Sequence, residues 1–326
     1  MTNDDRRACR EILRHGSKSF HAASLLLPSD VRDAAAALYA FCRLADNAVD
    51  ERDDSKAASS EEILFELDRR LDAVYADQPL DGPVDRAFRS VVRKYSIPRA
   101  VPAALLEGLR WDEEGRGYEE LPDLYDYAVR VGSTVGVMMT LVMGRRDAAT
   151  LADAAELGMA MQLTNICRDV GEDARRGRLY LPARPLREYG VKIEEWLERP
   201  LPLPGIVESV SRLLDDADRL YARSWSGISR LPARSRPAIR AASLLYAAIG
   251  REIRSAGFDS VDRRAWTSRR TKLSILARAA LSSRAPGSAF PGAAGSHGDA
   301  DSGSDPARKA TAELVSAASN FRPGPG

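Results

Sequence analysis

Four aspartates form two pairs with the same spacing. Asp46 and Asp50 lie in the segment YAFCRLADNAVDE, and Asp169 and Asp173 lie in QLTNICRDVGED. Residues i and i+4 share one face of a helix, and carboxylates on one face suit Mg²⁺, which binds carboxylates, waters and substrate phosphates. A single pair of this kind is usually a solvated surface. Two pairs, each beside apolar residues, predict carboxylates at a core edge that a metal cation neutralises.

Each acidic pair is preceded by polar residues on the same helix face. Arg43 and Tyr39 precede the first pair in helical steps, and Asn165 and Gln162 precede the second. The two amides provide neutral oxygen atoms that can bind a metal or orient the carboxylates. They are equally suited to a buried hydrogen-bonded cross-link between helices, and the spacing alone leaves both interpretations open.

Three arginines follow the second acidic pair, in the segment ARRGRLYLP. Arg175, Arg176 and Arg178 could bind phosphate oxygens, because a guanidinium group matches the geometry of a phosphate. The alternative is an arginine-rich surface turn. Gly177 is expected to end the helix, and Leu179 then returns the chain to the core. Arg178 is therefore the favoured phosphate ligand of the three.

Four segments resemble motifs of the squalene/phytoene synthase family of head-to-head prenyl transferases. In chain order they are HGSKSFHAASLLLP at 15–28, YAFCRLADNAVDE, YAVRVGSTVG at 127–136, and QLTNICRDVGEDARRGRLYLP at 162–182. The resemblance extends from residue 7 to residue 284. The departures are small. Asn47 stands where the family commonly has an aspartate. Residues 131–136 read VGSTVG where the family usually has VAGTVG, so Gly132 and Ser133 replace one pair of small residues by another.

The resemblance implies the condensation of two geranylgeranyl diphosphates through prephytoene diphosphate to phytoene, with release of diphosphate, in carotenoid biosynthesis. Mg²⁺ is the implied cofactor, with Mn²⁺ as an alternative ion, and no nicotinamide cofactor is expected. The main alternative is a family member that uses farnesyl diphosphate to make dehydrosqualene, presqualene diphosphate or squalene. A chain-elongating synthase or a terpene cyclase would favour the closer DDxxD spacing, and an inactive subunit would have no reason to keep four costly carboxylates.

The resemblance also assigns roles to individual residues. The expected metal ligands are Asp46, Asp50, Asn165, Asp169 and Asp173. The four aspartates, together with Arg43 and Tyr127, form the expected catalytic set. The expected substrate- and diphosphate-binding residues are Ser17, Lys18, Ser19, Phe20, Tyr39, Arg43, Gln162, Asn165, Arg178, Tyr246 and Arg264.

Small and apolar residues are expected at the cavity wall. Phe20 and Ser24 share a helix face, and a small residue at position 24 leaves more depth than an aromatic one. This favours a twenty-carbon substrate over a fifteen-carbon one. A second set of residues could line the cavity or instead serve helix packing, namely Gly132, Val135, Gly136 and Met139.

The chain as a whole predicts an all-α, single-domain bundle of the isoprenoid synthase type with a central cavity. Of its 326 residues, 44% are hydrophobic, and helix formers dominate. Residues 1–284 are expected to form the synthase domain, and residues 285–326 a disordered, low-complexity tail, because the tail has little apolar content. Apolar residues recur with a helical period in the ranges 4–26, 30–50, 60–77, 83–95, 99–114, 123–144, 148–174, 206–229, 234–256 and 267–284.

Charge, cysteine content and hydropathy limit the kinds of partner and the cellular compartment that are expected. A net charge of +1 gives no signature of nucleic-acid binding. Cys9, Cys42 and Cys167 are widely spaced and lack nearby histidines, so neither a disulfide framework nor a zinc site is indicated and a reducing cytoplasm is expected. No apolar run approaches the roughly 20 residues that span a bilayer. Peripheral membrane association would suit lipophilic substrates, although no polybasic amphipathic helix is evident.

Overall fold

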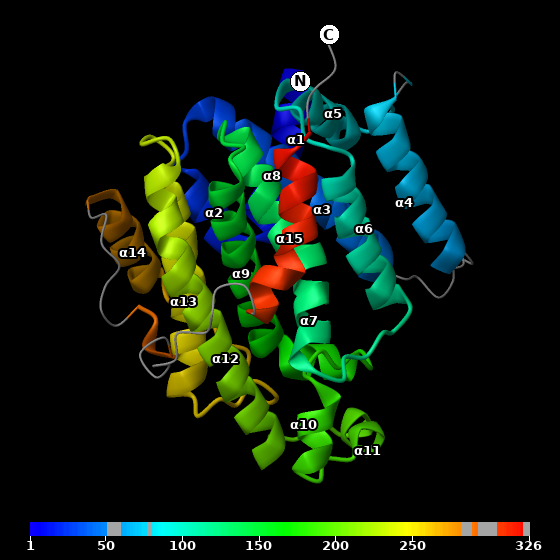
Figure 1. The fold of residues 1–326 in the computed structure, drawn as a ribbon, viewed down its shortest axis with the longest axis vertical. Coiled ribbons are helices and arrows are strands. Elements are labelled where there is room, and N and C mark those ends of the chain that lie inside the picture. The colour runs from blue at the N-terminus through cyan, green and yellow to red at the C-terminus, as the bar shows by residue number, and fades with distance from the viewer. Residues whose placement is uncertain (51–59, 77, 79, 282–288, 293–304, 322–326) are drawn as a thin grey trace.

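A computed structural model describes residues 1–50, 60–76, 78, 80–281, 289–292 and 305–321, and all regular structure in these ranges is helical (Figure 1). The all-α expectation is therefore confirmed for the described residues. The α-helices are α1 (Asn3–Gly16), α2 (Lys18–Ser24), α3 (Ser29–Asp50), α4 (Ser60–Tyr75), α5 (Pro83–Lys94), α6 (Ala100–Glu113), α7 (Leu121–Ala128), α8 (Thr134–Val142), α9 (Ala148–Arg175), α10 (Ala183–Glu188), α11 (Ile193–Glu198), α12 (Pro204–Ser224), α13 (Arg236–Ser255), α14 (Arg269–Leu281) and α15 (Pro306–Ser319). A π-helix, η1 (Val129–Ser133), joins α7 to α8, and a 3₁₀-helix, η2 (Trp225–Arg230), follows α12.

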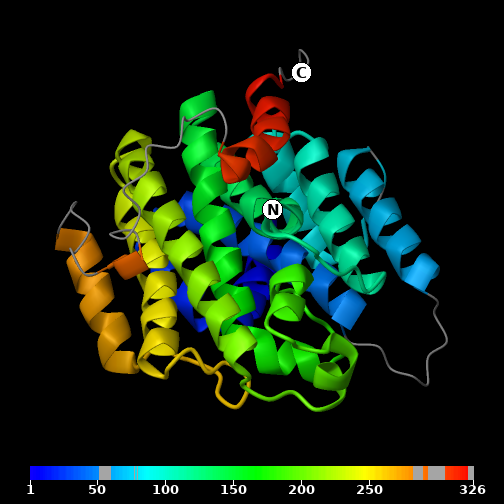
Figure 2. The same cartoon turned by 60° about the horizontal axis from the view of Figure 1, so that its bottom comes forward.

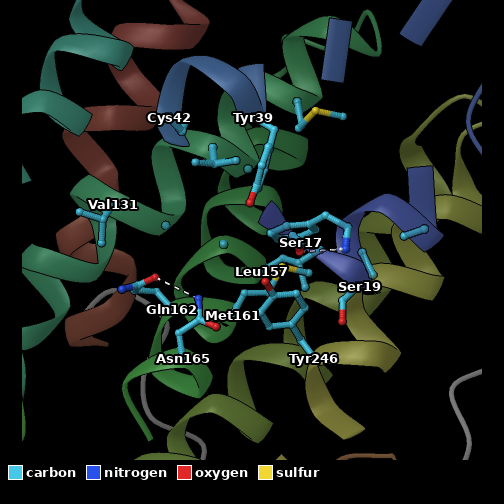
Figure 3. Close-up of a pocket in the computed structure, with 18 of the residues that line it drawn as sticks. Ser17, Ser19, Tyr39, Cys42, Val131, Leu157, Met161, Gln162, Asn165 and Tyr246 are labelled. Carbon is cyan, nitrogen blue, oxygen red and sulfur yellow. Dashed lines mark hydrogen bonds between the residues drawn. The ribbon is translucent and has the colours of Figure 1, made fainter. Parts of the chain in front are cut away.

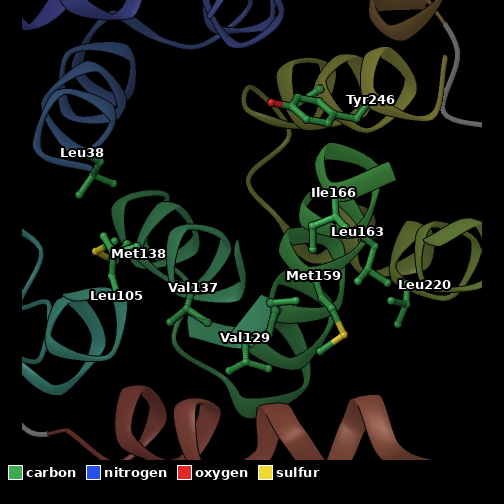
Figure 4. Close-up of a cluster of buried hydrophobic side chains, with 14 of the residues drawn as sticks. Leu38, Leu105, Val129, Val137, Met138, Met159, Leu163, Ile166, Leu220 and Tyr246 are labelled. Atoms are coloured by element: carbon green, nitrogen blue, oxygen red, sulfur yellow. The ribbon is translucent and has the colours of Figure 1, made fainter. Parts of the chain in front are cut away.

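Helix α9 is the centre of the bundle. Its 28 residues extend about 42 Å at about 1.5 Å per residue, and it packs against α8, α12, α13, α15 and η1 (Figure 2). Met159 and Leu163 on α9 are fully buried and form one apolar cluster with Val137 of α8 and Leu220 of α12 (Figure 4). Because α9 also carries the second acidic pair, the same packing that builds the core fixes that pair in space.

The sequence predicted one helix over residues 4–26, and this prediction is wrong at Ser17. The backbone of Ser17 is extended, with φ −145° and ψ 104°. Its Oγ accepts a hydrogen bond of 3.2 Å from the amide of Phe20 and so caps a new helix, α2. The hydrophobic periodicity continues across the break, which is why the pattern did not reveal it. The break turns α2 relative to α1 at the segment expected to bind diphosphate.

Close backbone approach joins η1 and α8 to α9. A Cβ at Gly132 would lie 2.6 Å from the carbonyl oxygen of Gly158, and a Cβ at Gly136 would collide with the carbonyl oxygen of Ala154. Only glycine permits this separation. Ser133, which is fully buried, donates a hydrogen bond of 2.7 Å from its Oγ to the carbonyl of Ala155. The helix-packing interpretation of Gly132 and Gly136 therefore holds.

Two short helices, α10 and α11, were not predicted. Each has six residues, fewer than the window over which helical periodicity can be recognised. They cap the end of the bundle to which α9 delivers its acidic pair (Figure 1).

Residues 306–319 correct the prediction of a disordered tail, because they form helix α15. Asp305 caps it by accepting a hydrogen bond of 2.9 Å from the amide of Ala307, and Pro306 occupies the first turn. Leu314 and Val315 are buried against the bundle, where α15 contacts α9, α7 and α6. Averaging composition over the whole tail concealed this one amphipathic segment.

Ion pairs also hold α15 in place. Glu156 of α9 is 1% exposed. Its Oε1 lies 3.3 Å from Nη2 of Arg223 and 3.1 Å from Nε of Arg308. Arg223 pairs in addition with Asp305. A buried carboxylate with two cationic partners ties α9, α12 and α15 together.

Candidate functional site

A cavity of about 860 Å³ lies in the middle of the bundle (Figure 3). Its volume is near the upper end for small-molecule sites. α2, α3, α9 and α13 form its walls together with η1, α8 and η2. The residues predicted from the sequence to bind substrate or metal converge on it, and those that line it are Ser17, Lys18, Ser19, Phe20, Tyr39, Arg43, Asp46, Tyr127, Gln162, Asn165, Asp169, Asp173, Arg178, Tyr246 and Arg264.

Asp50 is the exception among the predicted residues. It is the last residue of α3, but its side chain lies outside the described residues. Of the three arginines that follow the second acidic pair, Arg176 lines the cavity but Arg175 does not. Nη2 of Arg175 instead donates a hydrogen bond of 2.8 Å to the carbonyl of Val261. Arg178 lines the cavity just after Gly177, whose φ of +75° ends the helix as expected.

The first acidic motif contains an ion pair. Nη1 of Arg43 lies 2.7 Å from Oδ2 of Asp46, and both side chains are about 40% exposed. Tyr39 lies one helical turn before Arg43, and its ring packs on Gly16. A Cβ at position 16 would collide with the hydroxyl group of Tyr39. Burial raises the pKa of Tyr39, so the phenol stays neutral.

The second acidic motif holds two carboxyl groups in unlike environments. Burial alone would raise the pKa of Asp169, but hydrogen bonds from Arg168 and Arg264 bring that pKa below its usual value. The Nε atoms of both arginines lie 2.8 Å from Oδ1 of Asp169. Burial and the neighbouring charges of Asp169 and Glu172 instead raise the pKa of Asp173 to about 7.

Asn165 offers an oxygen atom suited to a cation. Its Nδ2 donates a hydrogen bond of 3.4 Å to Oε1 of Gln162 (Figure 3), while its own Oδ1 is buried without a hydrogen-bond partner. This orphan oxygen lies one turn before Asp169 on the same helix face. A neutral oxygen and carboxylates on one face form the donor set of Mg²⁺, so the residues present fit that ion.

Within the described residues, no three histidine, cysteine, aspartate or glutamate side chains are grouped closely enough to hold a metal ion by themselves. Mg²⁺ typically binds through one or two carboxylates plus waters and substrate phosphates.

Cationic and aromatic side chains also line the cavity. Phe20 packs against Tyr246 in a tilted arrangement, with ring centroids 4.9 Å apart, and meets Tyr39 edge-on at 6.3 Å. Lys18 and Lys272 both line the cavity, and burial together with the charge of Lys18 lowers the pKa of Lys272. Lys272 was not among the site residues predicted from the sequence. It lies in the segment TSRRTKL, but only the fold reveals which of its cations faces inward.

A carboxyl group that the sequence analysis missed joins two phenols. Tyr127 donates a hydrogen bond of 2.9 Å to Oδ2 of Asp112, and Tyr180 donates one of 2.7 Å to Oδ1. The two rings are stacked, with centroids 5.1 Å apart. Burial raises the pKa of Asp112 to about 6, although both hydrogen bonds oppose the rise. Asp112 occurs in the run WDEE, which reads as a solvated helix end, so no local signal distinguishes it.

The predicted cavity-wall residues are also present. Ser24 is 6% exposed, lines the cavity beside Phe20, and donates a hydrogen bond of 2.7 Å from its Oγ to the carbonyl of His21. Gly132 and Gly136, which pack against α9, line the cavity as well, as do Val135 and Met139. The two interpretations of the glycines are therefore compatible.

Comparison with known proteins gives a consistent result. A sequence model of the squalene/phytoene synthase family matches residues 13–276. The chain is 51% identical over 298 residues to the phytoene synthase of Cereibacter sphaeroides, which covers 89% of this chain and 84% of that protein. It is 49% identical over 285 residues to the phytoene synthase of Rhodobacter capsulatus, covering 86% and 82%.

Solved structures share the fold. A dehydrosqualene synthase superposes with a TM-score of 0.76 at 30% identity, covering 85% of this chain and 96% of that one. A squalene synthase from Alicyclobacillus acidocaldarius superposes with a TM-score of 0.70 at 24% identity, covering 78% and 95%. With a family match over most of its length, and with the motifs of that family converging on one cavity, the chain belongs to the squalene/phytoene synthase family.

Proposed function

We propose that this protein is a phytoene synthase, which condenses two molecules of geranylgeranyl diphosphate head-to-head through prephytoene diphosphate and releases diphosphate. The observation that carries the proposal is one cavity in which both acidic motifs and several cationic side chains meet, and whose remaining wall is largely apolar. The names of the bacterial relatives with about half of their residues identical support the choice of product.

The cavity has room along its length for a long prenyl chain. It follows α9 from Asp173 to Thr150, a distance of about 35 Å at about 1.5 Å per residue. Apolar side chains, among them Met139, Leu157 and Ile228, line much of the part farther from the two acidic motifs. Asp153 also lies there, paired with Arg230. A geranylgeranyl chain extends to roughly 20 Å, given carbon–carbon bonds of about 1.5 Å, so it fits within this length.

The proposed cofactor is Mg²⁺, with Mn²⁺ as an alternative ion. The residues that would hold it are Asp46, Asp50, Asn165, Asp169 and Asp173. When bound, the ion supplies positive charge that stabilises a departing diphosphate. Because the proposed reaction ends with proton loss, it requires no nicotinamide cofactor.

Side chains of the protein supply the remaining functions. Ser17, Lys18, Ser19, Arg43, Arg178 and Arg264 line the charged end, where hydroxyl, ammonium and guanidinium groups can donate hydrogen bonds to diphosphate oxygens. Lys272, which faces Lys18, adds a further cation.

The aromatic and apolar walls protect the reacting carbon atoms. Tyr127 and Tyr180 present stacked rings beside the cavity, and Phe20 and Tyr246 present a second pair. An aromatic face attracts a cation without reacting with it, and an apolar enclosure excludes the water that would otherwise trap an allylic carbocation. Burial raises the pKa of Tyr127 well above its usual value, so this phenol remains neutral and is not a competing nucleophile.

The test is incubation of the purified chain with Mg²⁺ and either geranylgeranyl or farnesyl diphosphate, without a reductant, followed by mass spectrometry of the extracted products. A forty-carbon hydrocarbon formed only from geranylgeranyl diphosphate is the expected result. The variant Asp173→Asn should form little product, whereas Asp72→Asn, with a side chain 63% exposed on α4, should match the wild type. A thirty-carbon product would instead assign the protein to the farnesyl-using branch, and no product from either substrate would refute the proposal.

A further inference from the structure

The segment from residue 263 to residue 281 is strongly basic in a chain whose net charge is only +1. It contains Arg263, Arg264, Arg269, Arg270, Lys272 and Arg278 and no aspartate or glutamate. Arg264 pairs with Asp169, and Lys272 faces the cavity. The other four arginines are exposed, and no ion pair joins them to a carboxylate among the described residues.

Large apolar side chains are exposed among these arginines. Leu273 is 67% exposed and Leu281 is 89% exposed. Together with Ala277 they recur every four residues, so they share one face of α14. The opposite face carries Ile275 and Ala279, which are buried where α14 packs on α13. A helix with apolar residues on both faces is expected to bury both, and this bundle covers only one.

Trp266 extends the exposed apolar surface to the mouth of the cavity. It lies three residues before α14, is 76% exposed, and lines the cavity together with Arg264 and Lys272. Both overall views show α14 as the outermost helix beside α13, at the side of the bundle opposite α4 (Figures 1 and 2). The basic, apolar surface therefore adjoins the opening through which substrate would enter.

We propose that this surface, called here the α14 face and made of Trp266, Arg269, Arg270, Leu273, Arg278 and Leu281, docks on an anionic lipid bilayer. Arginines attract anionic headgroups, leucines on the same face enter the boundary of the acyl chains, and tryptophan favours the membrane–water interface. No helix among the described residues is long and apolar enough to cross a bilayer, so the α14 face would bind to the membrane surface.

Docking through the α14 face would give the mouth of the cavity direct access to a lipid phase. The benefit of this docking rests on the proposed function, because the proposed substrate and the forty-carbon product both partition into bilayers. Its test does not use catalysis, so failure to bind lipid leaves the proposed condensation intact, and failure to form phytoene leaves the docking surface intact.

The first measurement is co-sedimentation of the full-length chain with vesicles of phosphatidylcholine alone and of phosphatidylcholine mixed with phosphatidylglycerol. Binding to the anionic vesicles that weakens as salt rises is expected, because salt screens the attraction. If the chain binds neither kind of vesicle, the proposal is overturned. Tighter binding to duplex DNA or to RNA than to anionic vesicles would overturn it too, by assigning the arginines to nucleic acid.

Tryptophan fluorescence tests which surface touches lipid. Of the four tryptophans, Trp111 is 8% exposed, Trp196 is 3% exposed and Trp225 is half-buried, whereas Trp266 is 76% exposed. Anionic vesicles should therefore shift the emission to shorter wavelength, and brominated lipids should quench it. Trp266→Phe should abolish both changes. If both changes persist in that variant, a different surface meets the membrane.

Matched variants separate the α14 face from general charge and hydrophobicity. Removal of a basic residue near an anionic surface weakens binding about fivefold, so Arg270→Glu should weaken vesicle binding by at least that factor. Lys94→Glu, an equal charge change at an exposed residue of α5, should leave it unchanged. Leu273→Ser should also weaken binding, while Phe65→Ser, at a residue 70% exposed on α4, should not.

The same variants identify the remaining alternatives. Equal loss of vesicle binding in Leu273→Ser and Phe65→Ser would refute the assignment to this face. If gel filtration shows a dimer that Leu273→Ser dissociates, the face belongs to an interface with a second copy and the proposal is overturned.

Discussion

The buried carboxyl group of Asp112 should make the folded state less stable as pH rises. Burial raises its pKa to about 6, whereas an aspartate in an unfolded chain has a pKa of about 3.9. Between these values the folded state holds a proton that the unfolded state has released. The contribution of Asp112 to stability is therefore present in full below about pH 4 and is lost as pH rises through 6.

The magnitude follows from the difference between the two pKa values. A difference of about two pKa units changes the free energy of unfolding by roughly 3 kcal/mol in total as pH rises through both pKa values. About 1 kcal/mol of this is lost between pH 5 and pH 7. An unfolding entropy of about 2.1 cal/mol/K per residue converts that loss to a fall of about 1.5–2 °C in Tm for a chain of this length. Asp112→Asn removes the titration but keeps an oxygen that can accept a hydrogen bond from Tyr127 or Tyr180.

The assay is a comparison of Tm at pH 5 and pH 7 for the wild type and for Asp112→Asn. The wild type should lose about 1.5–2 °C more than the variant across this interval, because the other titrating groups are common to both. Asp72→Asn removes one negative charge at an exposed position on α4 and should show the wild-type difference. An unchanged pH dependence in Asp112→Asn would show that the carboxyl group is not the buried acid inferred from its contacts.

Three further predictions test other parts of the structure. Ser24→Phe narrows the cavity beside Phe20 and should shift the ratio of kcat/KM toward farnesyl diphosphate by at least about tenfold; an unchanged ratio would refute the assignment of chain length to this position. Gly136→Ala places a methyl group against the carbonyl of Ala154 and should destabilise the protein by about 1–3 kcal/mol in urea unfolding, with a neutral effect contradicting the close approach of the helices. Leu314→Ala should destabilise it by about 2–5 kcal/mol, because this side chain is 7% exposed; a loss below about 0.5 kcal/mol, as at a surface position, would mean that α15 does not pack on the bundle.

Long periodic helices were predictable because burial on one face leaves a repeating pattern. α3 and α9 begin and end within two residues of the ranges that periodicity indicated. The π-helix η1 was not predictable, since it changes the register of backbone hydrogen bonds without changing the side-chain pattern. The break at Ser17 was hidden for a related reason, because the apolar residues on its two sides happen to continue one period.

The residues of the site were predictable where the chain brings them together locally. Gln162, Asn165 and Asp169 lie on one face of one helix, so their spacing alone places them side by side. Asp112 meets Tyr180 only through the packing of α6 against the segment that follows α9, a contact across 68 residues of sequence. Such a contact has no local signature, and a single sequence cannot supply it.

The structure also changes the electrostatic argument for a metal. The cost of burying four carboxylates predicted a metal, but Arg43 pairs with Asp46, and Arg168 and Arg264 pair with Asp169. For these two aspartates, arginines already reduce the cost of burial.

The proposed cation would therefore act mainly in the second motif. The pKa of Asp173 is raised to about 7 by burial and by the negative charges of Asp169 and Glu172, because these outweigh Arg176 and Arg178. One helical turn before Asp169, Oδ1 of Asn165 is buried without a hydrogen-bond partner. A divalent cation would favour the ionised form of Asp173 and would bind the free amide oxygen of Asn165. Asn165 and Asp173, rather than the number of carboxylates, are thus the features of the site that favour the proposed Mg²⁺.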